Sequence, residues 1–208
     1  MRTTGIGDFL KRVAGSIAPR TQHSRRDLSS WDRSISSGVG TIGLSAGGRL
    51  SAGGPTVSVE TEYLGTLEAQ LEPAQAVGSR LILNVPGGTI QGPKIDGTIV
   101  QPAADWLMPM PDGSLRLDVR TTIKTSDGEF ILVEYNGVIV PSKEVSDRLS
   151  KGEVITAKDE YFLTAPRFTT ASENYDWLNY DWLNKVQAVG KMVTLSQKGI
   201  KYDLFIVR

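Results

Sequence analysis

Isolated charges beside aromatic and apolar residues are the part of this sequence best suited to chemistry. Arg80, Asp105 and Arg120 each lie in or at the end of an apolar segment between Gly78 and Gly128, and Trp106 follows Asp105. An unpaired charge is costly in apolar surroundings. Because several such charges on converging strands more often line a cavity than fill a core, we predict that they share a pocket for a small ligand. An apolar wall such as Trp106 would raise the pKa of Asp105 and make its carboxyl a candidate general acid or base.

The composition excludes several other kinds of catalyst. The chain of 208 residues has no cysteine, which excludes disulfides and thiolate chemistry, and its one histidine, His23, lies in a segment without a strand or helix pattern. A Ser-His-Asp triad, a histidine-rich metal site and most zinc chemistry are therefore excluded. The sequence also has no glycine-rich dinucleotide fingerprint, no Walker loop and no cluster of metal ligands. We accordingly predict neither a cofactor nor a metal.

Two interpretations of the charged and aromatic residues remain open. In the first, Arg120 is catalytic together with Asp105, and Arg80 helps to hold an oxyanion or a carbonyl group of the substrate. The other predicted substrate-binding residues are Trp106, Glu134, Tyr161, Phe162 and Trp177. In the second interpretation these residues are structural: Asp105 caps a turn, the arginines form ion pairs, and Trp106 and Trp177 fill the core.

Short segments of alternating polarity predict a fold built mainly from β-strands. Apolar and polar residues alternate strictly over 115–124, which is typical of a strand with one buried face. Asp127-Gly128 favours a tight turn into a partner strand over 129–140. A second hairpin is predicted from 185–195 and 201–207.

Two further segments complete the expected elements. Residues 161–170 are predicted to be extended, although Pro166 argues against a fully paired central strand. A short helix is predicted within 141–152, with Ser142 as its N-cap and Gly152 in the left-handed conformation at its end. The pattern gives eight to ten strands and one or two helices. It favours a single antiparallel β-barrel over residues 55–208, because a parallel sheet would need a helix between successive strands.

Residues 1–54 differ in composition from the rest of the chain. They contain eight basic and three acidic residues, whereas residues 55–208 contain 15 basic and 20 acidic residues. The segment has too few apolar residues to bury a core, so we predict that it is disordered or loosely docked. A segment rich in Arg and Ser and poor in acids is equally typical of an organellar transit peptide. A cytoplasmic location is therefore expected, with an organellar location as the alternative.

Charge and apolar runs also limit the partners of the chain. The net charge is zero, so no global field attracts nucleic acid. No apolar run approaches the roughly 20 residues that a membrane-spanning helix needs, and we expect no membrane partner. Because exposed edge strands usually need covering, we expect a homodimer or a larger symmetric oligomer.

A set of motifs recurs in a characteristic order between about Val59 and Arg208. They are Val77–Arg80, Gly87–Pro93, Ala104–Trp106, Asp112-Gly113, Arg120, Thr125–Gly128, Tyr161–Thr170 and a Tyr-Asp-Trp-Leu-Asn unit before Val189-Gly190. In order and spacing they resemble the DUF3237 family, also called the UPF0311 proteins. This chain departs from the family pattern in two places. It has Gln101-Pro-Ala-Ala104 where the family usually has Gly-Gly-Ala, and its Tyr-Asp-Trp-Leu-Asn unit occurs twice in tandem. We interpret the repeat as a local duplication that is accommodated as an extra helical turn.

The resemblance implies a β-barrel reminiscent of the lipocalins, with a cavity open at one end. Some relatives in natural-product pathways resemble cyclases that add a phenolic or alcoholic oxygen across an alkene. We therefore expect a cofactor-independent cyclase or isomerase that acts on a small aromatic or polyketide-derived molecule. The same cavity equally suits a non-catalytic carrier, in which Asp105 would titrate like an ordinary carboxyl group.

Overall fold

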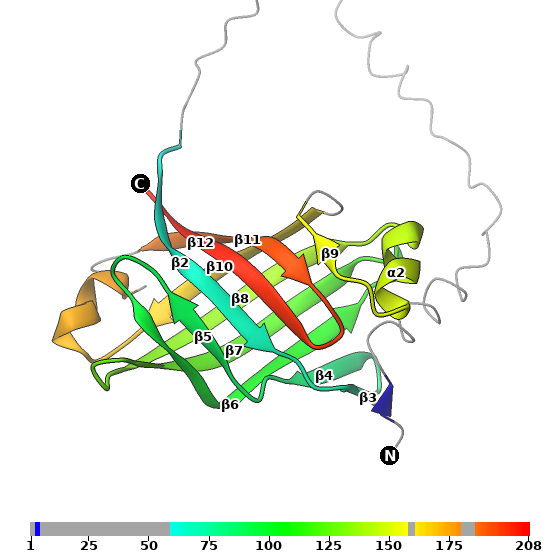
Figure 1. The fold of residues 1–208 in the computed structure, drawn as a ribbon, viewed down its shortest axis with the longest axis horizontal. Helices are drawn as coiled ribbons and strands as arrows, with labels where there is room; N and C mark the ends of the chain where they lie inside the picture. The colour runs from blue at the N-terminus through cyan, green and yellow to red at the C-terminus, as the bar shows by residue number, and fades with distance from the viewer. Residues whose placement is uncertain (1–2, 5–58, 158–160, 180–185) are drawn as a thin grey trace, which may run out of the picture. The chain divides into compact units, whose positions relative to one another are not determined.

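The part of the chain described by the computed structural model comprises residues 3–4, 59–157, 161–179 and 186–208. Within it the chain forms a closed antiparallel barrel of eight strands, which confirms the mainly β fold predicted from the sequence (Figure 1). The N-terminal segment 1–54 lies outside the described residues except for β1 (Thr3–Thr4), which pairs with β3 (Ala74–Val77). Among the described residues there is no helix long and apolar enough to cross a membrane.

The sheet closes into a barrel because the strands at the two ends of the row below, β6 and β7, pair with each other. The strands follow the order β6-β5-β2-β12-β11-β10-β8-β7, and β7 pairs with β6. Two shorter strands, β3 (Ala74–Val77) and β4 (Arg80–Asn84), continue the sheet from β6, and β9 (Ile155–Thr156) pairs with β11. The barrel strands are β2 (Thr61–Gln70), β5 (Gly88–Gln91), β6 (Asp96–Pro109), β7 (Leu115–Thr125), β8 (Phe130–Val140), β10 (Tyr161–Thr169), β11 (Gln187–Leu195) and β12 (Gly199–Val207).

Strand β6 changes its neighbour halfway along its length. Its first part, Asp96–Ile99, pairs with β5, whereas Ala104–Leu107 pair with β4. The register with β7 shifts between these two parts, so β6 bulges there. Gln101 lies in the bulge and donates a hydrogen bond from its side-chain amide to the carbonyl of Val85. Because the bulge immediately precedes the second part of β6, it sets the direction in which Asp105 points.

The alternation along β7 separates the inside of the barrel from its outside. Every second residue from Leu115 to Thr125 is buried, and the residues between them are exposed or half-buried. Strand β7 pairs with β8 along its length, and Gly128 in the turn between them has a φ of 97°. The hairpin predicted around Asp127-Gly128 is therefore present. The hairpin of β11 and β12 is present as well, with Leu195 opposite Ile200 next to its turn.

Strand β10 is paired on both sides, but unequally. It pairs with β8 over its whole length, whereas its register with β11 includes only Leu163 and Thr164. Pro166 lies beyond these two residues, so its missing N–H interrupts no ladder hydrogen bond with β11. The strand is thus central in the barrel without being fully paired, in line with the sequence prediction.

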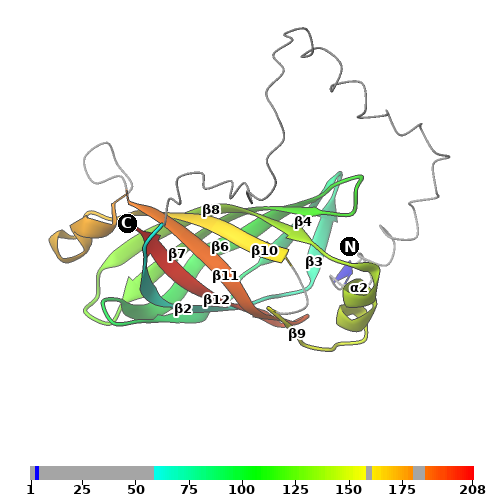
Figure 2. The ribbon, with the colours of Figure 1, turned by 90° about the horizontal axis from the view of Figure 1, so that it is seen from above.

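Helix α2 (Lys143–Ser150) lies at one end of the barrel, directly after β8 (Figure 2). The hydroxyl group of Ser142 accepts a hydrogen bond of 3.1 Å from the N–H of Val145, as expected for an N-cap. Gly152 has a φ of 85°, the left-handed conformation predicted for the end of the helix. Both local predictions are therefore confirmed.

The 3₁₀-helix η2 (Glu173–Leu178) lies at the opposite end (Figures 1 and 2). It contains most of the first Tyr-Asp-Trp-Leu-Asn copy, 175–179, and its Leu178 is fully buried. The side-chain oxygen of Asn179 accepts a hydrogen bond of 2.7 Å from the N–H of Thr170. The first copy is therefore part of the core at this end, whereas the second copy, 180–184, lies outside the described residues.

Gly65 on β2 lies close to Gly92, the residue that follows β5. A Cβ atom on Gly92 would lie 1.9 Å from the backbone oxygen of Leu64, and neither group can move without shifting a strand. We predict that Gly92→Ala lowers the free energy of unfolding by about 1–3 kcal/mol, measured by urea denaturation. Gly87→Ala is the control, because a Cβ there meets only the Gln70 side chain, at 3.7 Å. Equal stability of the two variants would contradict this close approach.

Candidate functional site

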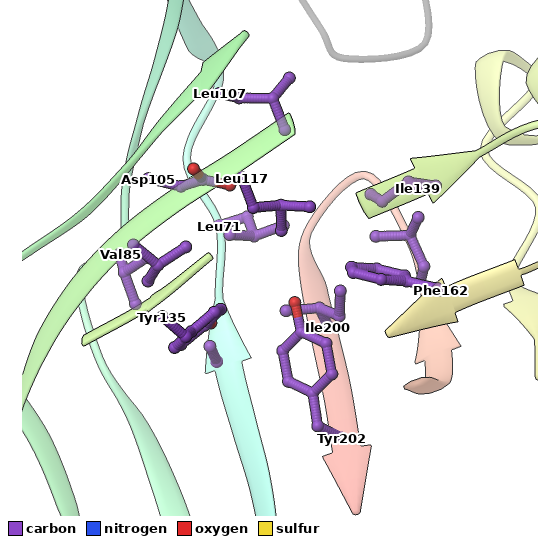
Figure 3. Close-up of a pocket in the computed structure, with 13 residues that line it drawn as sticks. Leu71, Val85, Asp105, Leu107, Leu117, Tyr135, Ile139, Phe162, Ile200 and Tyr202 are labelled. Carbon is purple, nitrogen blue, oxygen red and sulfur yellow. The ribbon is translucent and has the colours of Figure 1, made fainter. Parts of the chain in front are cut away.

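A narrow cavity lies inside the barrel, in the half where β8 ends and α2 begins (Figure 3). The free space beside these residues is about 410 Å³, part of which is open solvent, and the centres of water molecules can occupy about 30 Å³. Since one water needs roughly 10–15 Å³ by this measure, the cavity holds two or three waters, and a larger ligand needs the side chains to move apart. The lining residues are Ala69, Leu71, Val85, Asp105, Leu107, Leu117, Val119, Tyr135, Ile139, Phe162, Leu195, Ile200 and Tyr202.

Asp105 supplies the acidic group of this cavity. It lies opposite Val119 in the pairing of β6 with β7, faces inward and is 7% exposed. Its Oδ1 accepts a hydrogen bond of 3.1 Å from the backbone N–H of Asp118. Burial disfavours the ionised carboxyl more than this hydrogen bond favours it, and the pKa of Asp105 rises from 3.8 to about 7. Both protonation states are therefore populated at neutral pH.

Two tyrosines share the cavity with Asp105. Tyr135 on β8 and Tyr202 on β12 are 9% and 2% exposed, and their rings meet edge to face with centroids 6.0 Å apart. Tyr202 packs in the same way on Phe162, at 5.4 Å. Burial raises the pKa of both phenols, and the neighbouring charge of Asp105 raises it further. Both hydroxyl groups therefore stay protonated near neutral pH and can donate hydrogen bonds.

Arg120, predicted to act beside Asp105, lies on the outer face of the barrel wall. The residue opposite Asp105 is Val119, so the next side chain along β7 points away from the cavity. The Arg120 guanidinium forms ion pairs with Asp118 at 3.3 Å and Glu134 at 3.2 Å. It also lies 5.5 Å from the ring centre of Trp106. The structure thus brings Arg120, Trp106 and Glu134 together, but on the solvent side of the wall.

The other predicted site residues divide in the same way. Phe162 is buried and lines the cavity, whereas its neighbour Tyr161 is 59% exposed. Arg80 is exposed and donates a hydrogen bond of 3.0 Å to the carbonyl of Trp106. Trp177 lies in η2 at the far end of the barrel, where it packs against the core and Lys94 lies over its ring at 5.5 Å. Of the predicted residues, the structure places only Asp105 and Phe162 in the lining of this cavity.

Tyr135 and Tyr202 were not among the site residues predicted from the sequence, although one signal identifies them. Along β12, Ile200, Tyr202 and Leu204 alternate with more exposed residues, so Tyr202 shares the phase of the buried side chains. Tyr135 likewise follows Ile131 and Val133 at two-residue spacing. A tyrosine in the inward phase of a barrel strand brings a hydroxyl group into an apolar interior, which is a mark of a polar site.

In the described part of the chain, no group of three or more His, Cys, Asp or Glu residues could hold a metal ion. The cavity itself contains one carboxyl and two phenol groups among aliphatic side chains. This arrangement can give and take one proton at Asp105 and can hold an oxygen atom near the phenols.

The sequence of this chain matches a known family over most of the barrel. Residues 59–207 match the family described as "Protein of unknown function (DUF3237)". The UPF0311 protein RPA1785 of Rhodopseudomonas palustris is 31% identical over 128 residues, which cover 59% of this chain and 84% of that protein. The hydroalkoxylation enzyme phnH of Penicillium herquei is 31% identical over 100 residues, which cover 48% of this chain and 52% of that enzyme.

Solved structures agree with the sequence comparison. The crystal structure of RPA1785 superposes with a TM-score of 0.67 at 28% identity and covers 74% of this chain and 99% of that one. A β-barrel-like protein from Acinetobacter baumannii gives a TM-score of 0.59 at 26% identity, with 74% and 98% of the two chains covered. The resemblance noted in the sequence motifs is thereby confirmed.

The raised pKa of Asp105 predicts a specific dependence of stability on pH. The native protein keeps a proton that the unfolded chain releases near pH 4, so the contribution of Asp105 to stability is full below that pH and is lost as the pH rises through about 7. A difference of about three pH units corresponds to about 4 kcal/mol. We expect the free energy of unfolding of the wild type, relative to Asp105→Asn, to fall by about this amount between pH 4 and 8 in urea denaturation.

Asp112→Asn is the matched control for this measurement. Hydrogen bonds from the Ser114 hydroxyl and N–H lower the pKa of exposed Asp112, so its carboxylate is fully ionised above pH 5 in both native and unfolded chains. Its stability difference from the wild type should therefore stay constant between pH 5 and 8. Parallel curves for the wild type and Asp105→Asn would show that Asp105 titrates as an ordinary carboxyl group.

Proposed function

Since this chain belongs to the DUF3237 family, we propose that the cavity around Asp105 is the active site of a small-molecule cyclase. The proposed reaction is an intramolecular hydroalkoxylation, in which a hydroxyl oxygen adds across an alkene of the same molecule. Such a reaction requires a shaped pocket and the movement of protons, and no electron leaves or enters the substrate. It therefore needs no redox cofactor.

The observation that carries this proposal is the state of Asp105. Its carboxyl is buried among aliphatic side chains and has a pKa of about 7. A general acid works best when its pKa lies close to the pH at which the enzyme operates. A raised pKa brings no advantage to a carboxyl group with a purely structural role, because burial of that group costs free energy of folding at neutral pH.

The proposed step balances with one carboxyl group. Neutral Asp105 donates its proton to one alkene carbon, and the carbon–oxygen bond forms at the other while the alkene π bond breaks. The substrate hydroxyl then releases its proton to the Asp105 carboxylate. The product is an isomer of the substrate, and Asp105 returns to its starting state.

The aromatic walls fit the charge that develops during this step. Protonation of an alkene leaves positive charge on the neighbouring carbon, and Phe162 and Tyr202 present their rings to the cavity. Aromatic ring faces attract positive charge. The carboxylate of Asp105, formed at the same moment, adds an opposite charge inside an apolar site where electrostatic interactions are strong.

The relative in Penicillium herquei supports the reaction type. Its name states that it is a hydroalkoxylation enzyme, and its similarity to this chain covers about half of each sequence. The 31% identity between the two sequences over 100 residues is our reason for extending the reaction type to this chain. The substrate class we propose is an aromatic or polyketide-derived alcohol or phenol that carries an alkene side chain.

Incubation with a series of 2-alkenylphenols of increasing chain length tests the proposal. We expect the wild type to convert at least one of them into a cyclic ether of identical mass but different chromatographic retention. In D₂O the product should carry one additional deuterium on carbon, because the Asp105 proton exchanges with solvent. Probes that bind but return unchanged would instead identify the chain as a small-molecule binding protein.

Replacing the carboxyl group separates catalysis from binding. We predict that Asp105→Asn lowers kcat by about 10²–10⁴-fold, the usual contribution of general acid–base catalysis, and leaves probe affinity nearly unchanged. Asp112→Asn is the matched control, since that side chain is exposed and is not among the residues that line the cavity. Turnover by Asp105→Asn at the wild-type rate would refute the catalytic assignment.

The pH profile gives an independent test of the protonation state. Because neutral Asp105 donates the first proton, kcat/KM should be constant below about pH 7 and fall about tenfold per pH unit above it. Asp112→Asn should leave the profile unchanged, because exposed Asp112 is not among the groups that shift the pKa of Asp105. A kcat/KM that rises through pH 7 would mean that the carboxylate acts first, as a base.

A further inference from the structure

Polar atoms occupy a small part of the cavity wall. Of its lining side chains, only Asp105, Tyr135 and Tyr202 carry polar groups, and the others are alanine, leucine, isoleucine, valine and phenylalanine. The three polar residues come from β6, β8 and β12, which are far apart in the sequence. Figure 3 shows the Tyr202 hydroxyl group projecting into the space between Phe162 on one side and Asp105 on the other.

The two phenols form a connected pair. Their rings meet edge to face at 6.0 Å, and their hydroxyl groups interact with each other. Contact with Phe162 at 5.4 Å holds the Tyr202 ring from the other side. These edge-to-face contacts give the two rings a defined arrangement in the free protein.

No positive charge balances Asp105 within the cavity lining. In the part of the chain that the structure describes, the lining residues include no Lys, Arg or His, and the nearby Arg120 guanidinium is paired with Asp118 and Glu134 on the outer face. An anionic ligand would therefore lose its hydration without gaining a cation. It would also meet the charge of Asp105 whenever that carboxyl is ionised.

We propose that Tyr135 and Tyr202 are the oxygen-binding and specificity-determining residues of this cavity, and that they restrict its ligands to uncharged molecules with a single hydroxyl or carbonyl oxygen beside a hydrocarbon body. The inference rests on the proposed function for taking this cavity as the ligand site. It adds which class of ligand the cavity selects, a question that the assignment of Asp105 as the general acid does not answer.

The phenols set this selectivity because they donate hydrogen bonds but carry no charge. A ligand oxygen that accepts from one hydroxyl group replaces a hydrogen bond that it made with water. A hydrocarbon of the same shape leaves the phenols as they are in the free protein and gains only from apolar burial. The affinity for a ligand with a hydroxyl group should therefore depend on the two tyrosines, whereas the affinity for the hydrocarbon should not.

Three small probes of similar shape test this selectivity by calorimetric titration at pH 8. They are 2-allylphenol, allylbenzene and 2-allylbenzoate, which differ in having a neutral hydroxyl group, no polar group and a carboxylate. We expect the wild type to bind 2-allylphenol most tightly and 2-allylbenzoate at least about 100-fold more weakly, since burial of an unpaired charge costs several kcal/mol. Lowering the pH to 6 should strengthen 2-allylbenzoate binding relative to 2-allylphenol, because Asp105 becomes neutral.

Tyrosine-to-phenylalanine variants test the assigned residues. Tyr135→Phe and Tyr202→Phe should each weaken 2-allylphenol about 5–10-fold, the loss of one hydrogen bond, and change allylbenzene less than about twofold. Tyr63→Phe is the matched control, because Tyr63 is exposed and its hydroxyl group contacts Thr66 rather than the cavity. Circular dichroism and the melting temperature check that each variant folds.

The outcomes separate this inference from the proposed reaction. Equal affinity of the wild type for 2-allylphenol and 2-allylbenzoate at pH 8 would overturn the inference, as would an unchanged affinity for 2-allylphenol in both cavity variants. Failure of the wild type to bind either neutral probe would overturn it as well. The expected binding pattern without any cyclic product would sustain the inference and refute the cyclase.

Discussion

The pairing of Asp105 with Val119 across β6 and β7 decides which charges the barrel encloses. Because side chains alternate between the two faces of a strand, this register sends the Asp105 carboxyl inward and the Arg120 guanidinium outward. Inside, the loss of water raises the pKa of the carboxyl to about 7. Outside, Arg120 forms exposed ion pairs of the kind that contribute about 0–1 kcal/mol each. Arg120 follows the inward-facing Val119 by one position on β7, and this one position places its charge outside the barrel.

Much of the fold could be predicted from the sequence because its signals are local. The strict alternation of 115–124, the Asp127-Gly128 turn and the Ser142 cap each depend on a few neighbouring residues, and each appears in the structure. The pairing of β6 with both β5 and β4 is different. It depends on a bulge between Val100 and Ala104 that aligns segments distant in sequence, and no local pattern encodes it.

The candidate site was only partly predictable for the same reason. Apolar residues flank Asp105 on both sides, from Ala103 to Leu107. The local sequence therefore does not reveal whether Asp105 lies on the inner or the outer face of the strand. The sequence therefore identified Asp105 and Phe162 but grouped them with Arg120 and Trp106, which the register places on the other side of the wall. Tyr202 illustrates the reverse case, because its alternation with Ile200 and Leu204 is visible in the sequence but its meeting with Tyr135 requires the closed barrel.

The hydrogen bond from the Asp118 N–H joins the backbone of the barrel wall to the Asp105 carboxyl inside the barrel. The donor belongs to a residue with a partly exposed side chain, whereas the acceptor lies in the interior. The resonance of an amide proton responds to the charge of its acceptor, so ¹⁵N-labelled protein carries a built-in reporter at this backbone position. A spectroscopist can follow the ionisation of the enclosed carboxyl there without placing any dye, isotope-labelled ligand or substitution in the interior. The ionisation of a buried carboxyl can thereby be measured at a backbone amide of the strand that encloses it.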